Sequence, residues 1–303
     1  MSDLSPFKSR IYVRKRNAGL TPEQRTRVLL WRPARASAAV KETRVLPSGL
    51  HVRFLRVSKP RLAGRTLLFF SDTHIRSAGI SGFFPGVSQR GGTEWLTKAF
   101  HELFDAVPMP DCILFGGDLA GEAAWIGQGL DFLRGLPSGP HKFAVCGNWE
   151  LRRRWLPAEH WRDLFAEAGF RLLLNDSADA CGIRFHGLDD AKEGDGLSGE
   201  ADIPRSENVC ILSHNPDAAA AMLPTDRLKG APLILCGHTH GGQFRVPGFG
   251  AVLTSSRFGK RLEYGTYRHS STGATMYVTA GIGATWFHAR ICCPPEVLFV
   301  NFC

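Results

Sequence analysis

A chain of 303 residues, of which 44% are hydrophobic and 21% charged, can bury a full hydrophobic core, and this composition excludes a disordered, collagen-like or coiled-coil protein. Its apolar runs are much shorter than the roughly 18 residues of a membrane-spanning helix, and the N-terminus lacks the apolar segment of a signal peptide, so a cytoplasmic protein is expected. The net charge of +9 is unevenly distributed, because residues 1–65 carry a balance of +13 and the rest of the chain −4.

The basic residues define an N-terminal arm, which we place at residues 1–45. Thr21-Pro22-Glu23 is typical of a helix start, and the short helix that it opens is expected to end before Pro33. Basic residues lie beside Leu29-Leu30-Trp31, so the helix either lies at an anionic membrane surface or docks on the protein's own core. The arm as a whole is either a peripheral membrane contact or a solvated tail.

From Leu50 onward, apolar runs alternate with segments of helical periodicity, which predicts an α/β fold. The runs Thr66–Phe70 and Asp111–Phe115 have the continuous apolar character of buried strands, and apolar residues from Trp95 to Val107 recur at helical spacing. Strands are also expected at residues 52–55, 142–146, 171–174, 183–186, 209–212, 233–236, 251–254, 275–279 and 297–301, and helices at 123–133 and 158–168.

Four of the eight cysteines lie in or at the end of these apolar runs, where a free thiol behaves as a small buried hydrophobic group. They are Cys112, Cys146, Cys210 and Cys236. The chain has no C-x-x-C pair for zinc, so we expect free thiols and a reducing compartment.

Polar side chains follow the apolar strands at the points where the strands end. The first three strands lead to Ser71-Asp72-Thr73-His74, Gly116-Gly117-Asp118 and Gly147-Asn148-Trp149-Glu150. Later strands lead to Ser213-His214-Asn215-Pro216 and Gly237-His238-Thr239-His240. Because the carboxyl ends of strands in an α/β sheet converge on one crevice, these segments predict one site.

These residues favour the binding of two divalent metal ions. Asp-x-His and His-x-His place two side chains on the same side of an extended segment, so each pair can chelate an ion, and Asp118 can bridge both ions with its two oxygens. Oxygen and imidazole ligands without a thiolate favour Mn²⁺, Fe or Mg²⁺ over a structural zinc site. Two such cations polarise a phosphate and lower the pKa of a shared water, whose hydroxide can attack phosphorus in line without a protein nucleophile.

The ordered set resembles the signature of the calcineurin-like metallophosphoesterase superfamily, which is D-x-H, G-D, G-N-H-[DE], H and G-H-x-H. The resemblance runs from about Leu50 to the C-terminus, so residues 46–303 are expected to form the catalytic domain. Residues 214–217, 237–243 and 281–283, together with Arg290, are similar to a bacterial branch of single-domain phosphodiesterases. The resemblance implies a four-layer α/β/β/α sandwich with two mixed sheets.

The resemblance also implies a ligand set of seven residues. The first ion would be held by Asp72, His74 and His240, the second by Asn148, His214 and His238, and both by Asp118. Asp118, Asn148 and His240 would also be the catalytic residues. The expected ion is Mn²⁺, with Fe, Mg²⁺ and Zn²⁺ as alternatives.

One residue departs from the family pattern. Members usually carry a histidine after Gly-Asn, where it contacts the phosphate and can protonate the leaving oxygen, whereas this chain has Trp149. A missing acid slows an alkoxide leaving group most, so a diphosphate or an activated diester is favoured. A related branch that hydrolyses UDP-2,3-diacylglucosamine in lipid A biosynthesis also lacks this histidine, and some members of the bacterial branch share that activity. The alternative is that Trp149 only packs and that His186 or His288 supplies the proton.

The expected substrate contacts are Arg76, Trp149, Arg152 and Arg153. Arg152 and Arg153 belong to a run of three arginines that either binds phosphate or forms a solvated helix face. The apolar loop at residues 78–92 either meets acyl chains or a membrane, or caps an edge of the core.

Together these features predict a metal-dependent hydrolase that acts on a phosphorylated small molecule or lipid, such as UDP-2,3-diacylglucosamine. A nuclease or cyclic-nucleotide phosphodiesterase of the same fold is the first alternative, but nucleic acid is disfavoured because the positive charge lies in the arm and not in the catalytic domain. The second alternative is a non-catalytic metal-binding scaffold, although such a protein has no need to retain every metal ligand.

Overall fold

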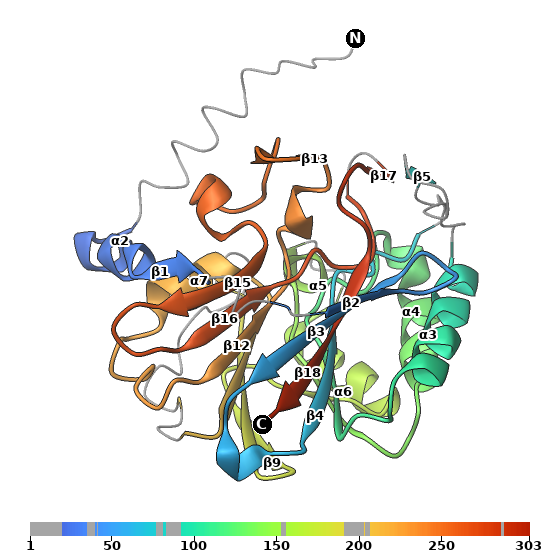
Figure 1. Cartoon of the computed structure of the whole chain (residues 1–303). Helices are drawn as coiled ribbons and strands as arrows, with labels where there is room; N and C mark the ends of the chain where they lie inside the picture. Colours follow the sequence, from blue (N-terminus) through green and yellow to red (C-terminus); the bar gives the residue numbers. More distant parts are fainter. Residues whose placement is uncertain are drawn as a thin grey trace.

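Two seven-stranded β-sheets packed face to face form the centre of the molecule, and helices cover their outer faces (Figure 1). The structure, a computed structural model, describes residues 20–34, 40, 42–76, 81–82, 92–152, 156–190, 203, 207–285 and 288–303. The order of the layers is the α/β/β/α sandwich that the family resemblance implies.

The first sheet has the strand order β2-β3-β18-β4-β6-β7-β8. Strands β4, β6, β7 and β8 are parallel, whereas β18 is antiparallel to β4 and parallel to β3. The carboxyl ends of β4, β6 and β7 therefore lie at the same edge of the sheet. The strands are β2 (Glu42–Val45), β3 (His51–Val57), β4 (Thr66–Phe70), β6 (Cys112–Phe115), β7 (His141–Ala144), β8 (Arg171–Leu172) and β18 (Glu296–Phe302).

The second sheet has the order β1-β15-β16-β12-β11-β10-β9, and its strands β16, β12, β11 and β10 are parallel. Its strands are β1 (Trp31–Pro33), β9 (Ser177–Ala180), β10 (Ile183–Leu188), β11 (Val209–Ser213), β12 (Leu233–Cys236), β15 (Gly265–His269) and β16 (Thr275–Val278). Two short pairs lie outside the sheets: β13 (Arg245–Val246) with β14 (Gly250–Ala251), and β5 (Ser81–Gly82) with β17 (Ala289–Arg290).

Helices pack on the outer face of each sheet. The first sheet is covered by α3 (Glu94–Ala106), α4 (Ile126–Arg134) and α6 (Ala158–Glu167), and the second by α2 (Pro22–Leu29) and α7 (Pro216–Met222). The remaining helical turns are η3 (Pro60–Leu62), η4 (Ala123–Trp125), α5 (Asn148–Arg152), η6 (His240–Gly242) and η7 (Gly259–Leu262). Among the helices of the described residues, none combines the length and the apolar composition needed to cross a bilayer.

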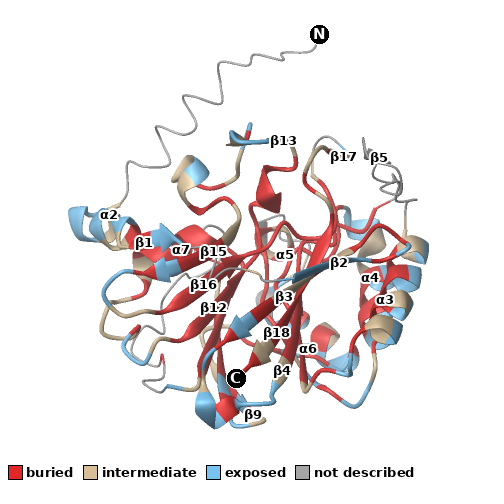
Figure 2. Cartoon of the chain, in the orientation of Figure 1, coloured by how far each residue is buried: buried red, intermediate tan, exposed pale blue. Residues whose placement is uncertain are grey.

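The central strands are buried on both faces, which explains their continuous apolar runs (Figure 2). In β4, Leu67 and Phe69 pack in the core between the sheets, while the alternate residues pack under the helices. Phe143 on β7 and Phe185 on β10 stack across the space between the sheets, with 4.7 Å between ring centroids. Burial of one such aromatic side chain stabilises the fold by about 1.5–3 kcal/mol, so this layer fixes the two sheets relative to each other.

The helix expected from Thr21 is shorter than predicted, and part of it is a strand. Helix α2 ends at Leu29, and Trp31–Pro33 pairs antiparallel with β15. Trp31 is buried against His269, which explains why the chain leaves the helix before this residue. Helix α2 contacts α7, and Arg27 donates a hydrogen bond to the carbonyl of Met222, so of the two interpretations the docked one holds.

The described part of the N-terminal arm contributes an edge strand to each sheet, since β1 and β2 both lie within residues 1–45. Residues 1–19, 35–39 and 41 of the arm lie outside the described residues, as does most of the apolar loop at 78–92. A truncation that leaves both sheets intact must therefore end before Trp31.

The prediction of a strand at residues 251–254 is wrong. Only Gly250–Ala251 pairs, and its partner is β13 rather than a strand of either large sheet. Val252 and Leu253 are exposed instead of contributing to the core.

Candidate metal centre

Loops from both sheets place seven predicted ligands at the carboxyl ends of five strands. Asp72 and His74 follow β4, and Asp118 follows β6. The others are Asn148 after β7, His214 after β11, and His238 and His240 after β12. All seven side chains are buried, so they form an interior polar cluster and not a surface patch.

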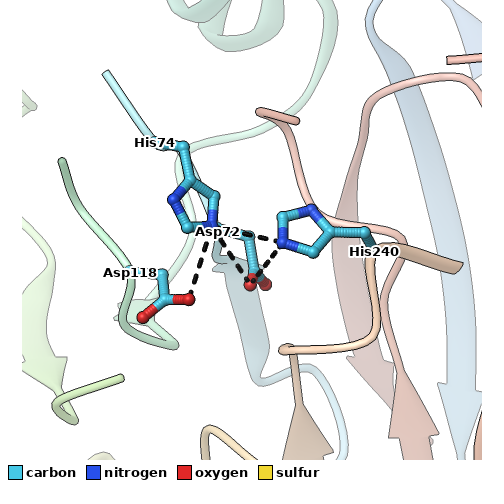
Figure 3. Close-up of side chains that lie close together, drawn as sticks. All are labelled: Asp72, His74, Asp118 and His240. Carbon is cyan, nitrogen blue, oxygen red and sulfur yellow. Dashed lines mark hydrogen bonds and ion pairs between the residues drawn. The ribbon is translucent and has the colours of Figure 1, made fainter. Parts of the chain in front are cut away.

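The first group consists of Asp72, His74, Asp118 and His240, and Figure 3 shows their side chains pointing toward one another. One ligand atom from each residue lies within 4.8 Å of the others. The Nε2 atom of His74 is 3.3 Å from Oδ2 of Asp118 and 3.2 Å from Nε2 of His240, which is 3.6 Å from Oδ1 of Asp72. Four donors so close together can surround one cation.

The second group consists of Asp118, His214 and His238, whose ligand atoms also lie within 4.8 Å of one another. Asp118 belongs to both groups, because its Oδ2 atom is 3.3 Å from Nε2 of His74 and 3.3 Å from Nε2 of His214. The sequence predicts that both oxygens of Asp118 take part, whereas its Oδ1 accepts the backbone N–H of Trp149 at 2.8 Å. A single oxygen, Oδ2, is therefore shared between the groups.

The residues present fit divalent metal ions. The side-chain oxygen of Asn148 is buried and accepts no hydrogen bond from the described residues, and the Nδ1 atoms of His74 and His240 are also buried without partners there. An unpaired buried oxygen costs about 1–3 kcal/mol, which a cation at this position would offset. Carboxylate, imidazole and amide donors without a thiolate suit a divalent cation of the Mn²⁺, Fe, Mg²⁺ or Zn²⁺ type.

The pKa values of Asp118 and His240 favour ligation, whereas the adjacent Asp118 raises the pKa of the buried His214 to about 10, an effect that a bound cation would reverse. Burial alone would raise the pKa of Asp118, but the adjacent His214 and His74 hold it well below its usual value. Burial, together with the nearby His74 and Arg290, lowers the pKa of His240 well below its usual value. Burial and the Asp118 charge raise the pKa of Asp72, an effect that a cation would reverse. A charged Asp118 and a neutral His240 are the forms that bind metals.

The backbone at the cluster is strained. Five of the predicted ligands have a positive φ: 55° at Asp72, 41° at His74, 61° at Asp118, 70° at His238 and 53° at His240. This conformation costs of order 1–3 kcal/mol for a residue with a side chain, and such strain concentrates at functional sites. Hydrogen bonds between the loops maintain it, since the N–H groups of Asp72 and His74 donate to the carbonyls of Gly117 and Asp118.

Glu150 is a site residue that we did not assign from the sequence. Its buried carboxylate accepts hydrogen bonds from the backbone N–H groups of Asp118, Leu119 and Gly147, at 2.7–2.9 Å. It therefore joins the loop after β6 to the loop after β7 and fixes the position of Asp118. The signal was present, because the family signature has an acidic residue at this place.

Arg290 and the segment Gly281–Gly283 support the first ligand loop. The buried guanidinium of Arg290 donates to the carbonyls of Ala280 and Gly283. The N–H groups of Ile282 and Gly283 donate in turn to the carbonyls of Ser71 and Asp72. These residues thus act on Asp72 through the backbone.

The predicted substrate contacts have different surroundings. Arg76 is buried, and its guanidinium donates to the carbonyls of His74 and Ala284. Trp149 is half-buried, and its indole forms a T-shaped contact with the ring of His74, with 5.2 Å between ring centroids. The side chain of Arg152, and Arg153 as a whole, lie outside the described residues.

The two alternative proton donors lie in other surroundings. His186 is buried on β10, where its Nδ1 is 2.8 Å from the hydroxyl of Ser177 on β9. His288 is exposed next to β17.

The chain is similar to known metallophosphoesterases. It is 37% identical to Phosphodiesterase YaeI of Escherichia coli (strain K12) over 105 residues, which are 34% of this chain and 33% of that protein. It is 30% identical to the uncharacterized metallophosphoesterase YkuE of Bacillus subtilis (strain 168), over 62% of this chain and 66% of that one. An uncharacterized metallophosphoesterase of Aquifex aeolicus (strain VF5) is 26% identical over 84% of this chain and 94% of its own length.

The matches thus span a third of YaeI and just under two thirds of YkuE. Residues 65–242 match the calcineurin-like phosphoesterase family, and this range contains all seven predicted ligands and more than half of the chain. The chain therefore belongs to the calcineurin-like phosphoesterase family of metal-dependent phosphoester hydrolases.

Proposed function

We propose that the protein holds two divalent metal ions and hydrolyses a diphosphate or phosphodiester bond of a membrane-lipid precursor such as UDP-2,3-diacylglucosamine. The observation that supports two ions is the position of Asp118 Oδ2, which is 3.3 Å from a histidine nitrogen of each ligand group. The first group would hold one ion, and Asn148, His214 and His238 would complete the other around the shared Asp118.

Bound divalent cations supply the polarisation of the phosphate and the activation of water in such sites. The chain's own groups keep the centre in place. Asp118 stays ionised because its pKa is held low, and its second oxygen is fixed by the Trp149 N–H. Glu150 holds the backbone on both sides of this contact, so the shared oxygen has little freedom to move.

Trp149 is the basis for the proposed bond type. Its indole lies against His74, beside the first ligand group, and an indole N–H donates a hydrogen bond but does not transfer a proton near neutral pH. A leaving group must therefore depart without an acid from this position. Phosphate esters leave readily as anions and alkoxides do not, which favours a diphosphate or an activated diester.

This assignment predicts a steep dependence of rate on leaving-group acidity. Across a series of aryl phosphodiesters, turnover of the wild type should fall steeply as leaving-group pKa rises. Trp149→His should flatten the slope and accelerate the poorest leaving groups by about a hundredfold, the usual effect of a positioned general acid. Hydrolysis of a diphosphate should change little in the same variant. The melting temperature of the variant serves as the control for lost packing.

A wild-type rate that does not depend on leaving-group pKa would contradict this role of Trp149. A panel of substrates then tests the substrate class: UDP-2,3-diacylglucosamine, bis-p-nitrophenyl phosphate and p-nitrophenyl phosphate with Mn²⁺, side by side. We expect the first two to be hydrolysed and the monoester to be poor. Preferred cleavage of cyclic nucleotides or of DNA in an extended panel would assign the alternative substrate class instead.

A further inference from the structure

A short segment beside the metal centre exposes an unusual amount of apolar surface. Within the described residues, large hydrophobic side chains that are strongly exposed occur singly at Leu29, Val45 and Met109, but four occur together on residues 246–253. These four are Val246, Phe249, Val252 and Leu253, with exposures of 48–62%. We call residues 244–253 the β13–β14 hairpin. Isolated exposed apolar residues are ordinary, whereas a contiguous group of them marks a contact surface.

The base of the hairpin is attached to the loop that carries His240. Gly242 lies so close to Ala251 that a Cβ at Gly242 would overlap the Ala251 side chain. Arg245 donates a hydrogen bond to the carbonyl of Gly241 at 2.8 Å, and the N–H of Val252 donates to the carbonyl of Phe244 at 2.9 Å. The base is therefore fixed beside the metal centre. Strand β13 lies at the top of the molecule in Figures 1 and 2, and Phe249, between β13 and β14, is 62% exposed.

The charges around the hairpin are positive. Residues 243–262 contain Arg245, Arg257, Lys260 and Arg261 but no acidic residue. Arg245 is paired with Glu263, just outside this segment, at 3.0 Å. For the other three cations, the segment itself contains no carboxylate. Lys260 is exposed, and its ammonium lies over the ring of Phe249 and donates to the Phe249 carbonyl. Apolar side chains at a tip with cations behind them are typical of segments that enter the interfacial layer of an anionic membrane.

We propose that the β13–β14 hairpin docks on an anionic lipid bilayer and holds the metal centre at the level of the lipid headgroups. A projecting hairpin needs no complementary pocket in its partner, which suits a bilayer. A second copy of the chain is disfavoured, because a symmetric contact would bring the cations of both copies together. The use of this docking surface rests on the proposed function, since docking would bring the metal centre to a lipid-borne diphosphate at the level of the headgroups.

The test is vesicle binding by the full chain, measured by co-sedimentation without any substrate. The probes are phosphatidylcholine vesicles with and without phosphatidylglycerol. A double variant, Phe249→Ser with Leu253→Ser, should bind the anionic vesicles at least about tenfold more weakly. The reason is that burial of each of these side chains in the bilayer contributes roughly tenfold or more to the affinity. Lys260→Gln should reduce the preference for anionic over neutral vesicles. Both changes lie at exposed positions, so the fold should be unaffected.

Met109→Ser is the matched control. Met109 is 52% exposed, comparable to Val252, but it precedes β6 and so lies at the opposite end of that strand from Asp118. This variant should bind vesicles like the wild type, and all variants should hydrolyse soluble bis-p-nitrophenyl phosphate at the wild-type rate.

Vesicle binding of the double variant equal to that of the wild type would overturn the proposal. A concentration-dependent dimer of the wild type that the double variant abolishes would also overturn it, by assigning the surface to a second copy. Normal vesicle binding without hydrolysis of UDP-2,3-diacylglucosamine would contradict the proposed substrate and leave the docking surface intact.

Discussion

Asp118→Asn is expected to lower phosphodiester hydrolysis at least about a thousandfold, equivalent to roughly 4 kcal/mol of transition-state stabilisation. The reason is that Oδ2 of Asp118 lies 3.3 Å from Nε2 of His74 and 3.3 Å from Nε2 of His214, so it is shared by the two ligand groups. An amide removes the negative charge from this position and can present N–H donors where two ligand groups need an acceptor. Turnover of bis-p-nitrophenyl phosphate at saturating Mn²⁺ is the measurement, with far-UV circular dichroism to verify the fold.

Asp111→Asn is the matched control for this loss. Asp111 lies just before β6, whereas Asp118 lies after it. The carboxylate of Asp111 accepts a hydrogen bond from the N–H of Thr66 and forms an ion pair with Arg65. This variant loses a charge at the far end of the same strand, so stability should fall modestly while turnover stays near the wild-type value. Near-normal turnover of Asp118→Asn would refute the assignment of Asp118 as the shared ligand.

Gly147→Ala is expected to disrupt the same carboxylate by overpacking. A Cβ at Gly147 would overlap Oδ1 of Asp118 and lie 2.6 Å from its backbone nitrogen. The two loops must separate to admit it, which should cost about 1–3 kcal/mol of unfolding free energy. Movement of Asp118 should also weaken metal binding and lower turnover by about a hundredfold, since displacements near 1 Å have such effects. Thermal unfolding and Mn²⁺ titration measure the two effects.

Gly127→Ala controls for the general effect of replacing glycine. Gly127 lies in α4, and a Cβ there has no atom within 4 Å. An alanine in this helix should leave turnover unchanged and raise the unfolding free energy by about 0.5–1 kcal/mol. Equal activity of the two alanine variants would mean that the contact between Gly147 and Asp118 does not position the ligand.

The strands and ligand loops of the centre could be predicted from the sequence because their signals are local. β4 has the predicted bounds, Thr66–Phe70, since a strand buried on both faces is apolar throughout. The ligands were found because each follows such a strand directly. In the two large sheets, the strands that escaped prediction are the edge strands β1, β2 and β9, and β15 next to β1. β1 and β2 carry charged and exposed residues, so no apolar periodicity marks them.

Glu296, which joins the two sheets, could not be found from sequence patterns, because its partners are distant in the chain. Glu296 begins the apolar strand β18. Its fully buried carboxylate accepts hydrogen bonds from Tyr277 on β16 and Thr279 just after it, and from Arg53 on β3. The residues next to this glutamate in the sequence do not predict such contacts. The β13–β14 hairpin was missed for a related reason, because the exposed Val252 and Leu253 resemble core residues in the sequence.

Electron paramagnetic resonance of the Mn²⁺-loaded protein, combined with the metal content per chain, tests the two-metal centre most directly. The shared position of Asp118 Oδ2 predicts two Mn²⁺ ions per chain and the spectrum of an exchange-coupled pair, both lost in Asp118→Asn. A single Mn²⁺ ion per chain with the spectrum of an isolated ion, or a coupled pair that persists unchanged in Asp118→Asn, would contradict the account.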